Sequence, residues 1–109
     1  MGELETTCNL GDALQNADVV YTDCWPGRAN EEERERIERL FSPYRVTRAL
    51  LERYAPDAFF LPCPPVHRTE EVDDDAMRSP QCRVYEAKEY LLHAKNAVLA
   101  WALCQAGVG

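Results

Sequence analysis

The chain has 109 residues, of which 46% are hydrophobic and 28% are charged, so it is long enough to bury one modest core. Its formal net charge of −7 argues against a nucleic-acid partner, because binding to phosphates needs a basic face. No apolar run reaches the length of a membrane span and no signal peptide opens the sequence, so we expect no membrane partner. The five cysteines are scattered and odd in number, which indicates reduced thiols in a cytoplasmic protein rather than a disulfide framework.

The first predicted elements are a short helix and a buried strand. Asn9 is a candidate cap for a helix over residues 10–16. Residues 17–23 are mostly apolar and rich in β-formers, which predicts a buried strand. The strand is followed by Pro26 and Gly27, which are typical of a turn.

A charged helix follows the turn. Asn30 is a candidate cap for a helix over residues 31–41, and glutamates and arginines four residues apart along it are typical of a solvated face. The apolar residues Ile37, Leu40 and Phe41 mark the face that we expect to pack inward.

The middle of the chain predicts two more strands with a helix between them. Residues 44–46 are a short strand candidate, and Thr47 can cap a helix that runs through Tyr54 and ends at Pro56. Residues 57–61 form the next apolar strand.

The last third predicts a short helix, a final strand and a long helix. Residues 73–75 are all aspartate, and negative charge is favoured at the start of a helix. Residues 83–85 are a strand candidate, and residues 86–105 predict a long helix that Gly107 stops. Strands alternating with helices at this spacing predict an α/β fold, part of a doubly wound parallel sheet of the Rossmann-like, three-layer α/β/α type, with a long C-terminal helix.

The final helix is apolar around much of its circumference. Such a helix needs cover on more than one side, and a chain of this length is too small to supply it. We therefore expect a second domain or another subunit to pack on the helix. Its apolar residues are Leu91, Leu92, Ala94, Ala97, Val98, Leu99, Trp101 and Leu103.

A proline-rich run, Pro62-Cys63-Pro64-Pro65, directly follows the strand over residues 57–61. Proline has no N–H and a fixed φ, so the chain must leave the sheet here and hold Cys63 in a rigid loop. In open α/β sheets this carboxyl edge is where ligands bind. His67 and Arg68 follow closely, and a thiol, an imidazole and a guanidinium within six residues indicate a site.

Simpler interpretations of these residues stay open. Cys63 fits a small buried apolar residue, the commonest role of a free cysteine. Asp23 fits a cap on the turn that follows it, and His67 fits a solvated loop position. A zinc site that combines Cys63 and His67 with Cys82 or His93 is disfavoured, because their spacing contains no paired Cys-x-x-Cys or His-x-x-x-His unit. We predict no metal site.

Several stretches of the sequence share their order and residues with one enzyme family. They are ADVVYTDCW at residues 17–25, EEE at 31–33, DAFFLPCPPVHRTEEV at 57–72 and LHAKNAVLAW at 92–101. Together they resemble the aspartate/ornithine carbamoyltransferase family, and within it the ornithine carbamoyltransferase branch. The resemblance runs from Leu10 onward and corresponds to the later part of the family's amino-acid-binding domain.

The resemblance implies an enzyme that transfers a carbamoyl group from carbamoyl phosphate to an amine, with no cofactor and no covalent intermediate. In the family the phosphate-binding loop, with its Ser-Thr-Arg-Thr signature, lies in a separate preceding domain, and this sequence contains nothing like it. We therefore expect residues 1–109 to be one partial amino-acid-binding domain that lacks the carbamoyl-phosphate-binding domain and is inactive by itself. The family also implies a homotrimer whose sites are completed by neighbouring subunits.

The resemblance also implies roles for individual residues. Asp23 matches the aspartate that holds the amine of ornithine, and Cys63 matches the catalytic-site cysteine of the branch's His-Cys-Leu-Pro motif, which lies at the reacting carbonyl and amine. Pro64-Pro65 matches the Leu-Pro step, which is similar to a cis-peptide site in the family and lies at the substrate. Arg28 and Arg68 are candidates to select the substrate, Arg28 by reading a carboxylate.

The sequence departs from the branch at three places. Pro62 replaces the histidine before the cysteine, residues 27–29 replace a Ser-Met-Gly loop that lines the ornithine pocket, and Leu91 aligns with an arginine that helps to bind the carbamoyl group. These departures favour an acceptor other than ornithine. They also favour an alternative, in which the chain is a non-catalytic module that binds an amino acid or assembles subunits.

Overall fold

Two short parallel strands organise the chain. In the computed structural model, which describes residues 2–27 and 29–107, β1 (Val19–Thr22) pairs with β2 (Phe59–Pro62). The register runs from Val19 opposite Phe59 to Thr22 opposite Pro62, so the carboxyl ends of both strands meet at one edge of the sheet. Both strands lie within or beside the predicted stretches, and the α/β class with parallel pairing is confirmed.

Four helices begin where a polar side chain accepts a backbone N–H, and the caps at Asn9, Asn30 and Thr47 are the ones that the sequence predicts. They are α1 (Leu10–Leu14) after Asn9, α2 (Glu31–Phe41) after Asn30, α3 (Arg48–Tyr54) after Thr47 and α4 (Asp74–Met77) after Asp73. The shortest contact is 2.6 Å, from the Ala76 N–H to the Asp73 carboxylate. These caps satisfy donors that a helix start otherwise leaves unpaired, which matters most for the one-turn helices.

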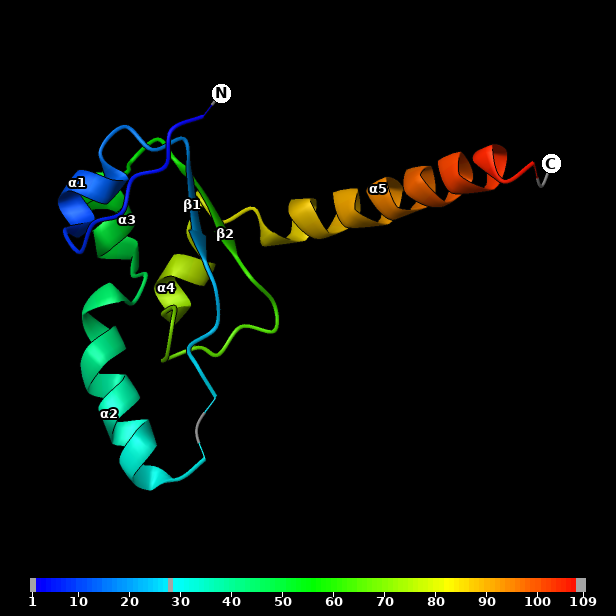
Figure 1. Cartoon of the computed structure of the whole chain (residues 1–109). Coiled ribbons are helices and arrows are strands. Elements are labelled where there is room, and N and C mark those ends of the chain that lie inside the picture. Colours follow the sequence, from blue (N-terminus) through cyan, green and yellow to red (C-terminus); the bar gives the residue numbers. More distant parts are fainter. Residues whose placement is uncertain (1, 28, 108–109) are drawn as a thin grey trace.

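The hydrophobic core lies between one face of the sheet and the helices beside it (Figure 1). Phe60, Leu51 and Val72 are completely buried in it. On the opposite face of the strands, Val19 and Phe59 are about half exposed and Tyr21 is 61% exposed. The described residues therefore cover one face of the sheet, and the second face is available for a further layer.

The prediction of a strand over residues 44–46 is wrong. A short 3₁₀ helix (Ser42–Tyr44) occupies this stretch, with Pro43 in its first turn, and the Arg45 N–H closes it on the Ser42 carbonyl at 3.2 Å. Only Val46 makes a β contact, an isolated parallel bridge to Val72. Val46 is buried, but Tyr44 is 42% exposed and belongs to the 3₁₀ helix, which leaves no room for a paired strand.

The prediction of a strand over residues 83–85 is also wrong. Cys82 makes an isolated bridge with Phe60, and the Arg83 N–H donates to the Phe60 carbonyl at 2.9 Å. The long helix α5 (Val84–Gln105) then begins two residues earlier than predicted. Pairing with β2 is therefore limited to the bridge at Cys82, and the helix begins two residues later at Val84.

The inner face of α2 is narrower than predicted. Ile37 is buried and Phe41 is half-buried, where its ring lies 6.0 Å from that of Trp25. Leu40 is 51% exposed, so its assignment to the inner face is wrong. The helix lies at the margin of the body (Figure 1), so only a thin stripe of it contacts other residues.

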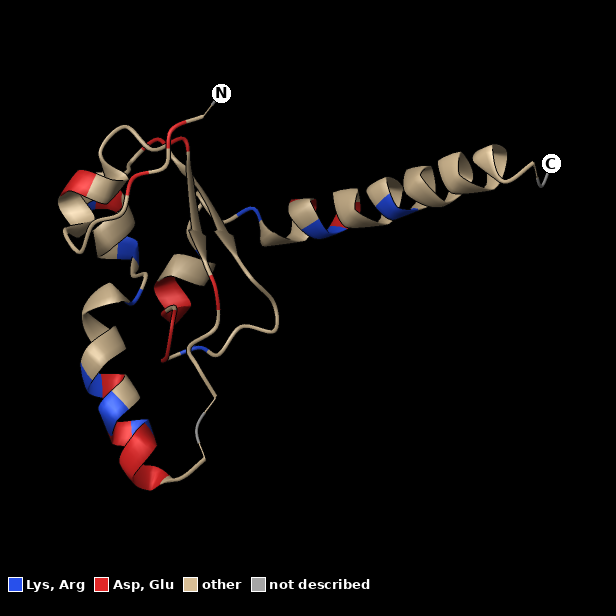
Figure 2. Cartoon of the chain, in the orientation of Figure 1, with Lys and Arg blue, Asp and Glu red and all other residues tan. Residues whose placement is uncertain are grey.

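Helix α5 projects from the body with its apolar residues exposed (Figure 1). Val84 in its first turn is its only buried residue. Its charged side chains end at Lys95, and residues 96–105 have none (Figure 2). Gly107 takes a φ of 69° just past the end, the left-handed conformation that stops a helix, as predicted. None of the helices in the described ranges is both long and apolar enough to cross a membrane.

Candidate functional site

The pairing register brings Asp23 and Cys63 to the same edge of the sheet. Each is the residue that directly follows its strand, and the two preceding residues, Thr22 and Pro62, are partners in the ladder. The Cys63 N–H donates to the Thr22 carbonyl at 2.9 Å, which ties the two strand ends together. The structure therefore joins two residues that the sequence separates by forty positions.

Asp23 is exposed at this edge. One carboxylate oxygen accepts the Cys24 N–H at 2.8 Å, and its own carbonyl accepts the Thr22 hydroxyl at 3.3 Å. The hydrogen bond to Cys24 orients the carboxylate and accords with the simpler interpretation as a turn residue. Exposure also leaves the carboxylate accessible to a cation such as a substrate ammonium.

Cys63 is half-buried beside Tyr21 of β1. A hydrogen bond with Cys63, followed by partial desolvation, raises the pKa of the Tyr21 phenol to about 12. Both residues line a mostly apolar hollow of about 290 Å³ between the sheet edge and the first turns of α5. Lys88 and Leu91 of α5 line the same hollow, so Lys88 brings a cation close to the cysteine loop.

The peptide bond between Pro64 and Pro65 is cis, as the family resemblance implies. The loop after Cys63 lies beside the turn that follows β1. Two backbone carbonyls of this loop then face Cys24, whose thiol donates to the Pro65 oxygen at 3.2 Å and to the Cys63 oxygen at 3.8 Å.

Cys24 is a connecting residue that the sequence analysis missed. Partial desolvation and the nearby carboxylates of Glu71 and Asp23 raise the pKa of its thiol, so it stays neutral and donates to the loop after β2. Its position directly after Asp23, at the end of a predicted buried strand, was the available signal. No spacing rule could reveal that the partner loop lies some forty residues further on.

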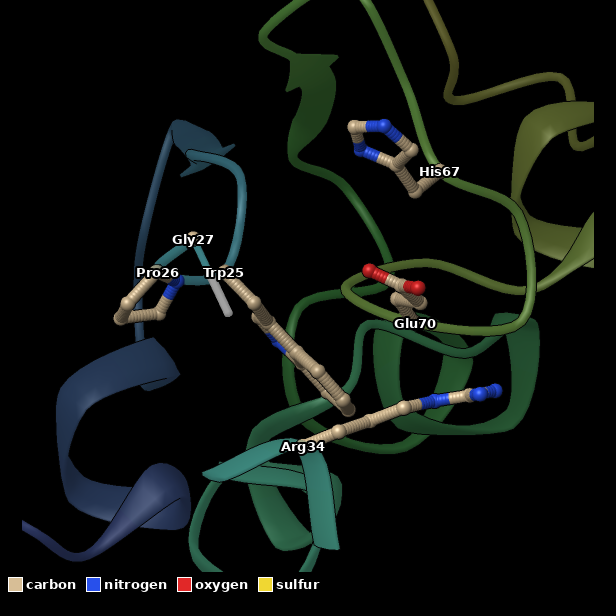
Figure 3. A pocket seen from close by; sticks show the side chains of 6 residues that line it. All are labelled: Trp25, Pro26, Gly27, Arg34, His67 and Glu70. Carbon is tan, nitrogen blue, oxygen red and sulfur yellow. The ribbon is translucent and has the colours of Figure 1, made fainter. Parts of the chain in front are cut away.

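A second hollow, of about 470 Å³, opens on the other side of this turn. Figure 3 shows Trp25, Pro26 and Gly27 along one side of it, His67 and Glu70 along the other, and Arg34 of α2 at its base. The Arg45 guanidinium lies 5.4 Å from the centre of the Trp25 ring and helps to hold that ring in place. The hollow thus presents an aromatic wall and side chains of both charge signs, a suitable lining for an amino acid.

The two predicted arginines are not equally placed. Arg28 lies outside the described residues, between Gly27 and Ala29 in the sequence. Arg68 pairs with Asp74 at 2.7 Å, both about half exposed, and it lines neither hollow in the part of the chain that the structure describes. The pair connects the cysteine loop to the start of α4, which is a structural role.

Comparisons with known proteins agree with this geometry. The model of the aspartate/ornithine carbamoyltransferase family, Asp/Orn binding domain, matches residues 1–102. The chain belongs to the aspartate/ornithine carbamoyltransferase family. The ornithine carbamoyltransferase of Mesorhizobium japonicum is 43% identical over 102 residues, which are 94% of this chain and 33% of that protein. The chain thus spans about a third of the length of the curated relatives it matches.

Solved structures of the family superpose on the same part of the chain. The ornithine carbamoyltransferase of Pyrococcus furiosus matches with a TM-score of 0.75 and 42% identity, over 84% of this chain and 29% of that one. An N-acetyl-L-ornithine transcarbamylase, solved with carbamyl phosphate and N-succinyl-L-norvaline, matches with a TM-score of 0.70 and 27% identity, over 85% of this chain and 29% of that one. One arrangement of strands and loops is therefore shared by carbamoyltransferases named for different acceptors.

Proposed function

We propose that this chain supplies the amine-binding half of a site that transfers a carbamoyl group from carbamoyl phosphate to an amino acid. The observation that carries the proposal is the meeting of Asp23 and Cys63 at the carboxyl edge of the paired strands. Family membership supports the reaction class, and the register supports a common site because it brings the two residues to one edge.

Asp23 anchors the reacting amine in this proposal. A carboxylate at a strand end binds an ammonium by charge-assisted hydrogen bonds and orients the nitrogen once it has lost its proton. Holding the amine near the carbonyl carbon turns a bimolecular encounter into a reaction within one complex. The fixed bond from the Cys24 N–H keeps the carboxylate in a single orientation for this task.

Cys63 contacts the reacting centre as a polar group and not as a nucleophile. Its thiol lies in a hollow with the Tyr21 phenol, which is un-ionised at neutral pH. Leu91 stands where the family has an arginine, and Lys88, one turn earlier on α5, lines the same hollow. A cation there would stabilise negative charge that develops on the carbamoyl oxygen, so we assign Lys88 this role.

The acceptor carries both an amine and a carboxylate in our proposal. The hollow beside Trp25 has Arg34 at its base, and Arg28 directly follows Gly27 in the sequence, a residue that lines the hollow. An arginine can bind a carboxylate with two parallel hydrogen bonds. The changed loop at residues 27–29 favours an acceptor other than ornithine itself, for example an acylated relative of ornithine.

The other half of the site comes from a carbamoyl-phosphate-binding domain, within a cytoplasmic homotrimer. The bare face of the β1–β2 sheet and the exposed α5 are surfaces on which such a domain and neighbouring subunits would pack. Residues 1–109 are then one partial amino-acid-binding domain, and they should show no turnover without that partner.

Reconstitution tests the proposal. The chain is mixed with a separately produced carbamoyl-phosphate-binding domain of the family, and carbamoylated products are measured for a panel of amino acids. Asp23→Asn should lower kcat/KM by on the order of 10²- to 10³-fold, while Asp18→Asn, at the opposite end of β1, should leave it unchanged. Cys63→Ala should cost on the order of 10²-fold, and Cys82→Ala serves as its half-buried control. Equal activity of Asp23→Asn and Asp18→Asn would refute the site.

A second function is favoured by the substitutions at residues 27–29 and at Leu91. In that alternative the chain binds an amino acid or a partner subunit without catalysis. Reconstituted mixtures would then form no product with any acceptor, although amino acids would still raise the melting temperature of the chain. If Asp23→Asn loses that stabilisation, amino-acid binding at Asp23 is supported and only carbamoyl transfer is excluded.

A further inference from the structure

Three side chains that can bind a metal gather under the turn after β1. The ligand atoms of Cys24, His67 and Glu71 all lie within 4.8 Å of one another. Cys24 comes from the end of β1, and the other two come from the loop after the proline run. We propose that these three residues form a site for one divalent metal ion of the zinc type.

The carboxylate of Glu71 is the strongest indication of such a ligand. The residue is only 2% exposed, and one of its oxygens accepts the backbone N–H of His67 at 2.6 Å. The other oxygen is buried and has no hydrogen-bond partner among the described residues. A buried carboxylate oxygen without a donor is costly, and a bound cation is the group that compensates it best.

His67 is placed to share this cation. Its Nδ1 lies 3.9 Å from the first Glu71 oxygen, and the side chain is 57% exposed, so the ring can turn. In Figure 3 the imidazole extends from its loop toward the segment of Trp25, Pro26 and Gly27, which directly follows Cys24 in the chain. Ligands of tetrahedral zinc are about 3.5 Å apart, so a small rotation of an exposed ring closes the site.

Cys24 completes the set with a sulfur ligand. Its thiol faces the carbonyls of Pro65 and Cys63 across the gap between the two loops. On binding, the metal–sulfur bond forms and the thiol proton is released to solvent, so the hydrogen bonds to the carbonyls are given up. Sulfur, imidazole and carboxylate together suit zinc, and three protein ligands leave a fourth position for water.

This site differs from the cluster that the sequence analysis considered and set aside. That cluster combined Cys63 and His67 with Cys82 or His93, whereas the structure selects Cys24 and Glu71 as partners of His67. The site lies one residue from Asp23, yet it uses neither Asp23 nor Cys63. Metal binding is therefore measurable separately from carbamoyl transfer.

Cobalt(II) is the probe for the test, because a thiolate ligand gives it an intense near-ultraviolet charge-transfer band. The full chain is used with Cys8→Ser and Cys104→Ser, since these two exposed thiols are a source of adventitious binding. We expect one equivalent of cobalt to bind with a thiolate band and one equivalent of zinc to displace it. Cys24→Ser should abolish the band, and His67→Gln should weaken binding by more than about 100-fold, exceeding the usual cost of losing an outer-shell partner.

Cys63→Ser and Cys82→Ser are the matched controls and should keep both the band and the affinity within about threefold. Glu71→Gln removes a buried charge, so its metal affinity is interpreted only where near-ultraviolet circular dichroism shows a native fold. If this variant does not fold, Cys24→Ser is the variant that decides the test. Absence of the band in the parent chain overturns the proposal. So does a band that survives Cys24→Ser or disappears in Cys63→Ser.

Discussion

The body and the projecting helix α5 differ in how far their apolar residues are buried. In the body, residues such as Leu51, Phe60 and Val72 are completely buried between the sheet and its helices. Along α5, Val98 and Trp101 are more than 60% exposed although they are just as apolar. The body is stabilised by its own core, whereas α5 is helical by local preference and carries a surface that nothing in the described structure covers.

This difference separates what each region contributes. The body alone determines where Asp23 and Cys63 meet. Val20 and Phe60 are opposite each other in the two strands and both are buried, and a register slip would move them out of the core. Helix α5 contributes Lys88 and Leu91 through its first two turns, and its remaining length is exposed. The body should therefore tolerate changes in α5 and not the reverse.

The largest expected effect comes from Phe60→Ala. Removing this buried ring should destabilise the chain by about 3–5 kcal/mol, because it leaves a cavity in the centre of the core. Leu99→Ala in α5 is the control and should change the free energy of unfolding by less than about 0.5 kcal/mol. Urea unfolding followed by circular dichroism measures both free energies of unfolding. A comparable decrease in the two variants would contradict the view that the body, and not α5, is stabilised by a buried core.

The second effect concerns Tyr21 on the bare face of the sheet. Its folded-state pKa of about 12 exceeds the ordinary value of 10.0, so the stability it contributes is complete below pH 10 and is lost as the pH rises through 12. Ultraviolet titration at 295 nm, with Tyr21→Phe subtracted, should show this late ionisation. Cys63→Ala should bring it closer to pH 10, and an unchanged curve would remove Cys63 as its cause.

A smaller effect should follow from losing a helix cap in the body. Asp73→Ala removes the acceptor of the Ala76 N–H and should cost about 1 kcal/mol, because α4 is a single turn that depends on this bond. Asp75→Ala, an exposed aspartate in the same turn, should cost clearly less. Thermal unfolding of the two variants compares them, and equal costs would show that general charge and not capping stabilises α4.

The smallest effect is expected for the ion pair between Arg68 and Asp74. Because both side chains are about half exposed, a double-mutant cycle with alanine should give a coupling of about 0.2–1 kcal/mol, falling with added salt. A similar value for the exposed pair of Arg48 and Glu52 would confirm a purely structural contact. A loss of activity in Arg68→Ala far beyond this coupling would instead give Arg68 a role with substrate.

Helix starts were the features that the sequence predicted best. Asn9, Asn30 and Thr47 each cap the helix assigned to them, since capping depends on a side chain and the next three residues, and the short helix predicted at residues 73–75 forms after Asp73. Strand predictions succeeded only for the two segments that pair with each other. The others failed because pairing is a tertiary event. A preceding 3₁₀ helix limits it to one bridge at Val46, and an early helix start prevents it at Val84.

The candidate site was predictable in part for the same reason. Asp23 and Cys63 follow predicted strands, so a parallel sheet brings them to one edge. Cys24 and Glu71 gave no local signal, because their proximity depends on the path of the proline loop across the end of β1. Arg68 was expected at the substrate, and its pairing with Asp74 depends on where α4 begins.

The most direct test of the central claim is an amide-shift titration of the isotope-labelled chain with amino acids that carry a second amine or acylated amine. We expect saturable shifts at Asp23, Cys24 and Cys63, lost in Asp23→Asn and retained in Asp18→Asn, with the amides of residues 92–105 unchanged. Saturable shifts confined to α5, or shifts at the strand edge that survive Asp23→Asn, would contradict an amine-binding site at this edge.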